Sequence, residues 1–437
     1  MKKAISVILA ILMILSFSAC GSASAEELSS AVEIEADPSM PEGFETAKVV
    51  KTGSGITVKS AEAWKEQYPE IYASYMKNEE NRDTVSYVEE YPMIGKLYNN
   101  MGFYKFYDSA RAHNYTVTDI TNTGRPHKLA NCFTCKSPNM TAMVNNEGDS
   151  VYATEADESF IAQLTEPISC YNCHANESGD LVVTHTYLAD AMGEDLNKVD
   201  ARNLSCAQCH NEYYFNPVTK ATTLPYSDLA TMTPDAMLDF YNNRLIVDGQ
   251  SFADYTNPIT GVRQIKVQHP EFETYMGEGS VHKDTFTCAD CHMGRATTEE
   301  GKTYVNHYLS SPLENEALLK NNCSTCHVDL KAEVRDIQET TERRTYAVGY
   351  ELELLHDKLA EAVAQSTVPE GEEAEDFTPA YTEAELNTLR TLSKNAQFYW
   401  DFVFVENSEG AHNSALDSKC LDKAEALCNQ ALGLFKR

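Results

Sequence analysis

Positive charge is scarce in this chain of 437 residues. Its 35 lysines and arginines stand against 66 aspartates and glutamates, which gives a formal net charge of −31. A protein with this excess of negative charge repels phosphate backbones and acidic membrane surfaces. We therefore expect no nucleic-acid partner. An anionic substrate would need a local pocket of positive charge to overcome the overall field.

Long apolar runs are also rare. The one candidate lies near the start, where two lysines precede an apolar stretch over 4–17. The sequence FSAC at 17–20 is similar to a lipobox. This is the pattern of a secretory signal, and the stretch is short for a membrane span. We expect a lipoprotein-type signal peptide over 1–19 and an extracytoplasmic protein attached to the membrane through a lipidated Cys20. Cleavage after Ala23 or Ala25, giving a soluble periplasmic protein, is the alternative.

Cysteine, by contrast, is abundant: ten of the 13 cysteines lie in five CxxC pairs, four followed by histidine and one by lysine. The five motifs are CFTCK (Cys132, Cys135, Lys136), CYNCH (Cys170, Cys173, His174), CAQCH (Cys206, Cys209, His210), CADCH (Cys288, Cys291, His292) and CSTCH (Cys323, Cys326, His327). Disulfides and zinc sites also use CxxC pairs, but they do not require histidine at the next position. Attachment of c-type haem does, because both thiols bind the haem and the adjacent histidine binds the iron. This composition predicts roughly 0.01 copies of CxxCH by chance, so four copies indicate four haem c groups.

The number of histidines limits how these haems can be ligated. Twelve are present, and four of them belong to the CxxCH motifs. Four of the remaining eight would give each of these haems a second axial histidine. Ligation by two histidines leaves no open position at the iron and suits electron transfer.

CFTCK differs from the other motifs in its last residue. Cys132 and Cys135 can attach a fifth haem, but Lys136 must then supply the proximal ligand. An amine binds iron only in its neutral form, so Lys136 must lose its proton on ligation. The unusual ligand indicates that this haem has a different task. The alternative is a CxxC pair that has lost its haem.

One CxxCK followed by four CxxCH motifs resembles the pentahaem cytochrome c nitrite reductases, the ammonia-forming enzymes, and the resemblance covers nearly all of the mature chain. The segment RAHNYTVTDI (111–120) is similar to the RGH-type segment of that family, with Ala112 in place of glycine. The resemblance implies that Arg111 lines the active-site pocket and that His113 is a distal haem ligand. It implies the same distal role for His282, His307 and His412, and it leaves His127, His185 and His356 without a ligand role.

Two further segments carry the resemblance, NEYYF (211–215) and KVQHPEFE (266–273). It implies that Tyr213 and His269 are catalytic. It also implies one bound Ca²⁺, held by the side chains of Glu212 and Gln268 and by the backbone carbonyls of Tyr213 and Lys266. Hard oxygen ligands of this kind suit calcium.

The implied reaction is the six-electron reduction of nitrite to ammonium. It requires an iron with an open face, which the Lys136 haem supplies, and four haems that deliver electrons to it. Arg111 and a protonated His269 would give the anion a positive pocket. His269 titrates in the right range to protonate the departing oxygens, and Tyr213 can donate a proton or a hydrogen atom.

The resemblance also implies partners. We expect a membrane quinol-oxidising multihaem cytochrome as electron donor, and hydroxylamine or sulfite as further substrates. Two other functions compete with this one. The first is a multihaem electron-transfer protein without a substrate, which has no use for the unusual ligand in CFTCK. The second is a related reductase that acts mainly on hydroxylamine, sulfite or tetrathionate.

The expected fold is mainly α, a multihaem cytochrome c fold with a haem-filled core and long C-terminal helices. We divide the mature chain into a flexible N-terminal arm (20–60), a pentahaem catalytic region (61–327) and a C-terminal helical region (328–437). Apolar residues at steps of three and four predict a long helix over 328–365, with Gly349 as a candidate break.

The last region continues with an acidic loop over 366–379 and two more helices, at about 382–405 and 414–435. The family resemblance implies that these long helices form a homodimer interface; packing against the same chain is the other use of such apolar stripes. Cys420 and Cys428 lie about 12 Å apart along the last predicted helix, too far for a disulfide.

Overall fold

The computed structural model of the protein describes residues 31–34, 40, 43–53, 55–122, 124, 126, 128–177, 179–371, 373 and 375–436. The predicted signal peptide and Cys20 lie outside the described residues. Among the residues that are described, no helix has the length and apolar character needed to cross a bilayer.

The chain is mainly helical, as expected from the sequence. The helices are α1 Pro69–Met76, α2 Tyr87–Glu90, α3 Ile94–Leu97, α4 Thr116–Asn122, α5 Pro138–Glu147, α6 Glu158–Ile161, α7 Thr186–Met192, α8 Ala201–Ala207, α9 Pro234–Asp239, α10 Glu271–Met276, α11 Cys288–His292, α12 Glu316–Asn321, α13 Leu330–Ala364, α14 Glu383–Phe404 and α15 Ser414–Leu432. Short strands form antiparallel pairs: β1 Ala31–Glu33 with β2 Lys48–Val50, β3 Tyr214–Phe215 with β4 Thr222–Thr223, β5 Ile246–Val247 with β6 Gln250–Ser251, β7 Tyr255–Thr256 with β8 Arg263–Gln264, and β9 Arg295–Thr297 with β10 Thr303–Val305.

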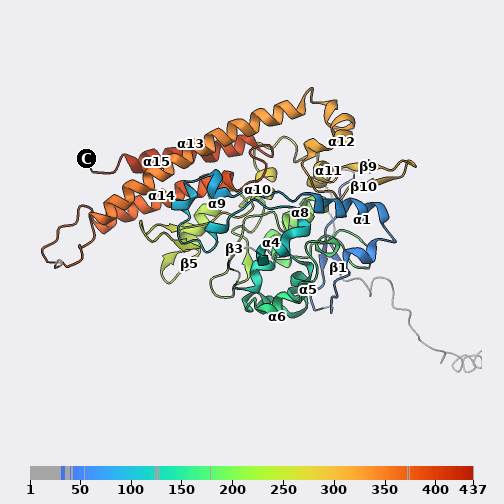
Figure 1. The fold of residues 1–437 in the computed structure, drawn as a ribbon, viewed down its shortest axis with the longest axis horizontal. Helices are drawn as coiled ribbons and strands as arrows, with labels where there is room; N and C mark the ends of the chain where they lie inside the picture. The colour runs from blue at the N-terminus through green and yellow to red at the C-terminus, as the bar shows by residue number, and fades with distance from the viewer. Residues whose placement is uncertain are drawn as a thin grey trace, which may run out of the picture.

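The three long C-terminal helices lie side by side along one side of the molecule, and the short helices and hairpins lie beneath them (Figure 1). Side-chain caps begin all three: Asp329 before α13, Thr382 before α14 and Asn413 before α15. The predicted helices at 382–405 and 414–435 are confirmed within a few residues. The indole N–H of Trp400 donates to the carbonyl of Thr345 at 2.7 Å, which joins α14 to α13 in the core.

The candidate break at Gly349 does not occur, because α13 runs through it from Leu330 to Ala364. The glycine serves close packing instead. A Cβ atom there would lie 3.2 Å from both Met93 Cε and Trp400 Cζ2. Helix propensity alone made this glycine resemble an interruption, whereas the contact between α13, α14 and α3 accounts for it.

The described part of the N-terminal segment also differs from the expected flexible arm. Strand β2 pairs with β1, and Val49 forms a parallel bridge with Val183. Ala47 and Val50 are buried, with 1% and 5% of their surface exposed. Apolar residues within a polar stretch therefore fasten this segment to the body of the protein.

Candidate haem and calcium centre

Each CxxC motif lies on a short helical turn. CYNCH begins a 3₁₀ turn over Cys170–Asn172, CAQCH lies at the end of α8, CADCH forms α11, and CSTCH begins a 3₁₀ turn over Cys323–Thr325. In CAQCH the N–H of His210 donates to the carbonyl of Cys206 at 2.9 Å. Residues three and four apart lie on the same face of a helical turn. The motif therefore places both thiols and the histidine toward the same space.

The four CxxCH histidines each face a histidine from a distant part of the chain. The ring centroids of the pairs lie 6.4 Å apart for His113 and His210, and 6.1 Å apart for His174 and His307, His282 and His327, and His292 and His412. A metal–imidazole bond of about 2 Å on each side of one ion places two opposed ring centroids about 6 Å apart. All four partners are the residues that the resemblance implied as distal ligands. The spacing fits a haem iron between the rings of each pair.

The cysteines show which motifs lie next to one another. The sulfurs of Cys135 and Cys209 lie within 4.8 Å of each other, and the N–H of Cys288 donates to the side-chain oxygen of Asn203 on α8 at 2.8 Å. Cys173 interacts electrostatically with Cys206, and Cys291 with Cys323. In space the motifs therefore run CFTCK, CAQCH, CADCH and CSTCH, with CYNCH beside CAQCH. Attachment points at these positions would hold the haems close together.

Lys136 lies close to CAQCH, since it interacts electrostatically with Cys209. It follows the 3₁₀ turn Ala130–Phe133 and precedes α5, and its carbonyl accepts the hydroxyl of Thr116 at 2.7 Å. That bond ties the segment 111–120 to CFTCK. Burial, followed by the charges of His210 and Lys136, lowers the pKa of His113 to about 3. His113, His210 and Lys136 therefore surround one common space.

His269 lies at the same space, in the segment between β8 and α10. Its ring centroid lies 6.3 Å from that of His210, nearly the same distance as that of His113. Burial lowers the pKa of His269 to about 3; Glu271 opposes the shift, and Lys136 adds to it. Burial therefore favours the neutral ring, whereas Glu271 favours the protonated ring that we expected.

Arg111 forms an ion pair within its own segment. Its guanidinium forms an ion pair with Asp119, with Nε 3.1 Å from Oδ1, and lies 3.9 Å from the ring centroid of Tyr115. The carboxylate of Asp119 therefore partly neutralises the positive charge of Arg111, which we expected to bind an anionic substrate. Tyr213 is half-buried and stacks on Phe215 at a centroid distance of 5.9 Å.

The residues predicted to hold calcium are brought together. Glu212 is fully buried, and one of its carboxylate oxygens accepts the backbone N–H of Gln268 at 2.6 Å. The side-chain amide of Gln268 donates to the carbonyl of Lys266 at 2.9 Å. Glu212 therefore contacts the backbone of Gln268, whose side chain contacts one predicted carbonyl ligand.

The charge at this site also suits a hard cation. Burial raises the pKa of Glu212 well above its usual range, with the carboxylates of Asp254 and Glu273 adding to the shift. Glu273 is 1% exposed, accepts the N–H of Glu212 at 3.0 Å, and has a pKa raised to about 8 by burial. Buried carboxylates that face one another are costly without a counter-charge. A bound Ca²⁺ would supply it.

Sequence reasoning missed several residues around these centres. Glu406 lies 2.6 Å from Nδ1 of His412, and nothing in the sequence near either residue signals that contact. His185 is buried, and its ring nitrogen lies within 4.8 Å of the sulfurs of Cys135 and Cys209, close enough for the three to hold a metal ion in a chain without haem. Its distance from both motifs in sequence hides this position.

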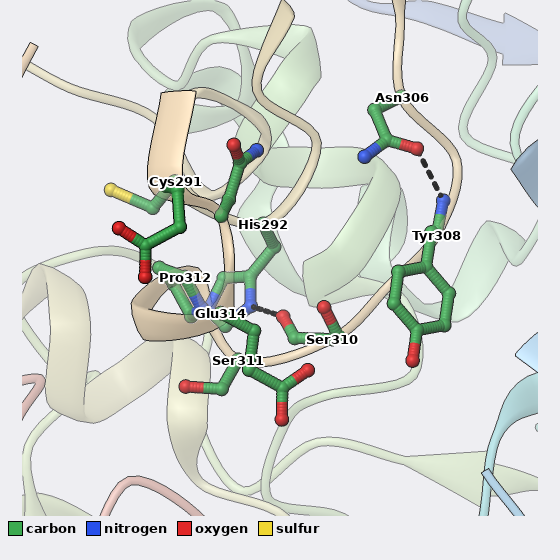
Figure 2. A pocket seen from close by; sticks show the side chains of 10 residues that line it. Cys291, His292, Asn306, Tyr308, Ser310, Ser311, Pro312 and Glu314 are labelled. Atoms are coloured by element: carbon green, nitrogen blue, oxygen red, sulfur yellow. Dashed lines mark hydrogen bonds between the residues drawn. The ribbon is translucent and has the colours of Figure 1, made fainter. Parts of the chain in front are cut away.

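A pocket lies beside CADCH. Figure 2 shows Cys291, His292, Pro312 and Glu314 close together, with Asn306 and Tyr308 on the opposite side. The ring of His292 points toward Ser310, with Nδ1 3.4 Å from the carbonyl oxygen. A backbone carbonyl at this place favours the tautomer that carries its proton on Nδ1 and leaves Nε2 free to bind a metal.

Comparisons with known proteins agree with this arrangement. Residues 60–436 match the model of the family described as cytochrome c552. The chain is 29% identical to cytochrome c nitrite reductase subunit NrfA of Nitratidesulfovibrio vulgaris over 419 residues, covering 85% of this chain and 77% of that one. It is 28% identical to cytochrome c-552 of Desulfotalea psychrophila over 395 residues, covering 84% and 73%.

A solved structure is similar over the whole fold. The cytochrome c nitrite reductase catalytic subunit of Desulfovibrio desulfuricans, which has two calcium sites, matches with a TM-score of 0.73 at 28% identity and covers 86% of this chain and 85% of that one. The mainly α, multihaem cytochrome fold expected from the motifs is therefore confirmed. Because the family model spans all five CxxC motifs and the three long helices, the chain belongs to the cytochrome c552 family.

Proposed function

We propose that this protein reduces nitrite to ammonium at a haem c attached through Cys132 and Cys135, with Lys136 as its proximal ligand. One observation carries the proposal: each CxxCH histidine faces another imidazole about 6 Å away, while CFTCK ends in lysine. Four haems would then have both axial positions filled by histidine. The haem at Lys136 would be the one able to take a ligand from solution.

The residues around Lys136 would bind and protonate the substrate. The guanidinium of Arg111 would bind the anion, drawn partly away from Asp119, with which it is paired in the free protein. His269 would donate a hydrogen bond to a substrate oxygen and pass protons to it. Tyr213 would supply a further proton or hydrogen atom. When bound, haem supplies the iron and the electrons.

Electrons would reach this site through the neighbouring motifs. Nitrite to ammonium takes six electrons and eight protons and releases two water molecules, so repeated delivery is required. The short distance between the sulfurs of Cys135 and Cys209 places CFTCK next to CAQCH, and CADCH and CSTCH continue the series. Close packing of the attachment points would give electrons a continuous route.

One Ca²⁺ would hold the catalytic segment in place. Its ligands would be the carboxylate of Glu212, the side-chain oxygen of Gln268 and the carbonyls of Tyr213 and Lys266. Glu212 and Gln268 directly precede Tyr213 and His269 in the chain. A cation held there would therefore fix both side chains and add positive charge near the anion.

The resemblance also supports a proposal for how the protein is exported and which proteins it binds. Residues 1–19 would be a lipoprotein-type signal peptide and Cys20 a lipidated anchor, with the soluble periplasmic form as the alternative. The electron donor would be a membrane quinol-oxidising multihaem cytochrome. The region 61–327 would carry catalysis, and the helices in 328–437 would form a homodimer. Tyr350 and Leu354 on α13 support such an interface, because their side chains are 53% and 48% exposed.

The test measures two quantities on the purified protein. Haem per chain comes from the absorbance of the pyridine complex, and ammonium is assayed after nitrite is supplied with reduced viologen. The proposal predicts five haems and one ammonium for each nitrite consumed. Four haems would contradict the fifth attachment site, and five haems without ammonium would favour an electron-transfer protein. Parallel assays with hydroxylamine and sulfite establish which substrate turns over fastest.

A further inference from the structure

The paired histidines differ in what their second ring nitrogen contacts. In three of them Nδ1 faces a backbone carbonyl: Gly179 for His174 at 2.6 Å, Val305 for His307 at 3.0 Å and Ser310 for His292 at 3.4 Å. A neutral carbonyl orients the ring and fixes its tautomer, but it adds no full charge. His174 and His307 face each other, so the haem between them forms the reference.

His412 contacts a carboxylate instead. Its Nδ1 lies 2.6 Å from Oε1 of Glu406, whose side chain is fully buried just after the end of α14. The other oxygen of Glu406 accepts the backbone N–H of Ser408 at 3.2 Å and its hydroxyl at 2.5 Å. These partners are donors, so the carboxylate acts as an acceptor on both oxygens. The proton of His412 then lies on Nδ1, and Nε2 faces His292.

Two more carboxyl groups lie near the same ring. Asp417, on the first turn of α15, is 1% exposed, and neither of its oxygens has a hydrogen-bond partner. Burial raises the pKa of Asp417 well above its usual range, which favours its neutral form. Glu271 at the start of α10 interacts electrostatically with His412. Charges are weakly screened in the protein interior, so the charges of Glu406 and Glu271 act on whatever His412 binds. The two buried carboxylates nearest the ring are contributed by two different elements of the C-terminal region.

A carboxylate hydrogen-bonded to an axial imidazole makes the imidazole a stronger electron donor. Stronger donation and nearby negative charge both stabilise ferric over ferrous iron and lower the reduction potential. We propose that Glu406 is a positioning residue that lowers the reduction potential of the haem attached at Cys288 and Cys291, below that of the haem held by His174 and His307. This inference rests on the haem ligation in the proposed function.

A lower potential at this haem would affect electron transfer along the series of motifs. CADCH lies between CAQCH and CSTCH in the spatial series. An electron that passes between CSTCH and CAQCH would have to cross this centre, so its potential would set the energy of that step. Glu406 would thus set how readily electrons pass along the series.

The chain provides a matched control. His327 also contacts a carboxylate, Glu333 at 2.6 Å, but that side chain is 47% exposed. Solvent screens an exposed charge, so its effect on the iron should be smaller. Glu333→Gln therefore removes a similar contact without removing buried charge.

The test is a redox titration of the fully loaded protein followed by electron paramagnetic resonance, in which each low-spin ferric haem gives its own signal. His412→Ala identifies the signal of the haem in question, because it turns that haem high-spin. In Glu406→Gln we expect this midpoint potential to become more positive, by about a tenfold change in the reduced-to-oxidised ratio, or 59 mV for one electron. Glu333→Gln should leave this midpoint in place.

A second variant gives the opposite sign. Ser408→Ala removes one donor from Glu406 and leaves its charge more available to His412, so the midpoint should become more negative. A general loosening of the site would not produce shifts of opposite sign in the two variants. The inference is overturned if this midpoint stays unchanged in Glu406→Gln with five haems bound, or in Ser408→Ala where Glu406→Gln does not fold. A missing haem in the parent protein would instead contradict the proposed function.

Discussion

The imidazole rings of His113 and His210 lie with their centroids 6.4 Å apart. The ring of His269 lies 6.3 Å from the same His210, so distance does not separate the two neighbours. Their proposed roles do differ, since His113 would bind the haem attached at CAQCH, whereas His269 would act on the substrate. The difference is open to a direct test.

Replacing these two histidines should give different results. In His113→Ala the haem at CAQCH loses an axial ligand, so one low-spin ferric signal should become high-spin. In His269→Ala all four low-spin signals should remain, while nitrite turnover falls by about 10²–10⁴-fold because a proton donor is lost. Electron paramagnetic resonance and an ammonium assay measure both. A loss of low-spin signal in His269→Ala would exchange the two assignments.

Calcium should decide whether Glu212 stabilises or destabilises the fold. The fully buried carboxylate is costly alone, since burial raises its pKa well above the usual range. Glu212→Gln keeps the shape and removes the charge. We expect it to lower calcium affinity at least about tenfold. With calcium the variant should melt below the parent protein, and in excess chelator it should melt at or above it.

Calorimetric titration measures the calcium affinity, and melting curves with and without calcium measure the change in stability. Glu278→Gln is the control, because that side chain is 91% exposed and should leave both quantities unchanged. Equal calcium binding by Glu212→Gln and the parent protein would remove Glu212 from the proposed ligands.

A buried lysine predicts how stability depends on pH. Lys394 is 5% exposed, and burial, followed by Arg263, lowers the pKa of its ammonium to about 8. The unfolded chain therefore binds the proton more tightly, and the charged form costs about 3 kcal/mol at pH values below 8. The hydrogen bond from Lys394 to the carbonyl of Phe252 at 3.1 Å returns about 1 kcal/mol.

Lys394→Met should therefore raise the melting temperature at pH 7 by about 2–5 °C. The gain should shrink as the pH rises toward 10, because the ammonium in the parent protein loses its proton and the penalty disappears. Lys419→Met, at an exposed lysine on α15, should show no such trend. A lower melting temperature for Lys394→Met at pH 7 would mean that the polar contacts outweigh the burial of charge.

The local parts of this structure could be predicted from the sequence. Two thiols and a histidine at fixed spacing are enough to identify an attachment turn, so all five motifs could be found from spacing alone. Periodic apolar residues likewise predicted a long helix over 328–365. In each case the determining residues are close in sequence, where spacing has a direct geometric meaning.

Other features depend on contacts between distant segments. The pairing of His292 with His412, the ion pair of Arg111 with Asp119 and the carboxylate of Glu406 beside His412 are set by the folded chain. The sequence marks Gly349 only as a candidate break, because the close approach of Met93 and Trp400 is set by other segments of the chain. No local pattern distinguishes a glycine that ends a helix from one that lets another helix approach.

The central claim is that the lysine of CFTCK marks the catalytic haem, and Lys136→His tests it most directly. The measurement is the rate of ammonium formation from nitrite in a variant that still carries five haems, with the potentials of the other four haems as a control. We expect loss of most nitrite turnover with those four potentials unchanged, because a proximal histidine like that of the other four haems removes the distinction of this haem. Unchanged turnover in Lys136→His would contradict the account.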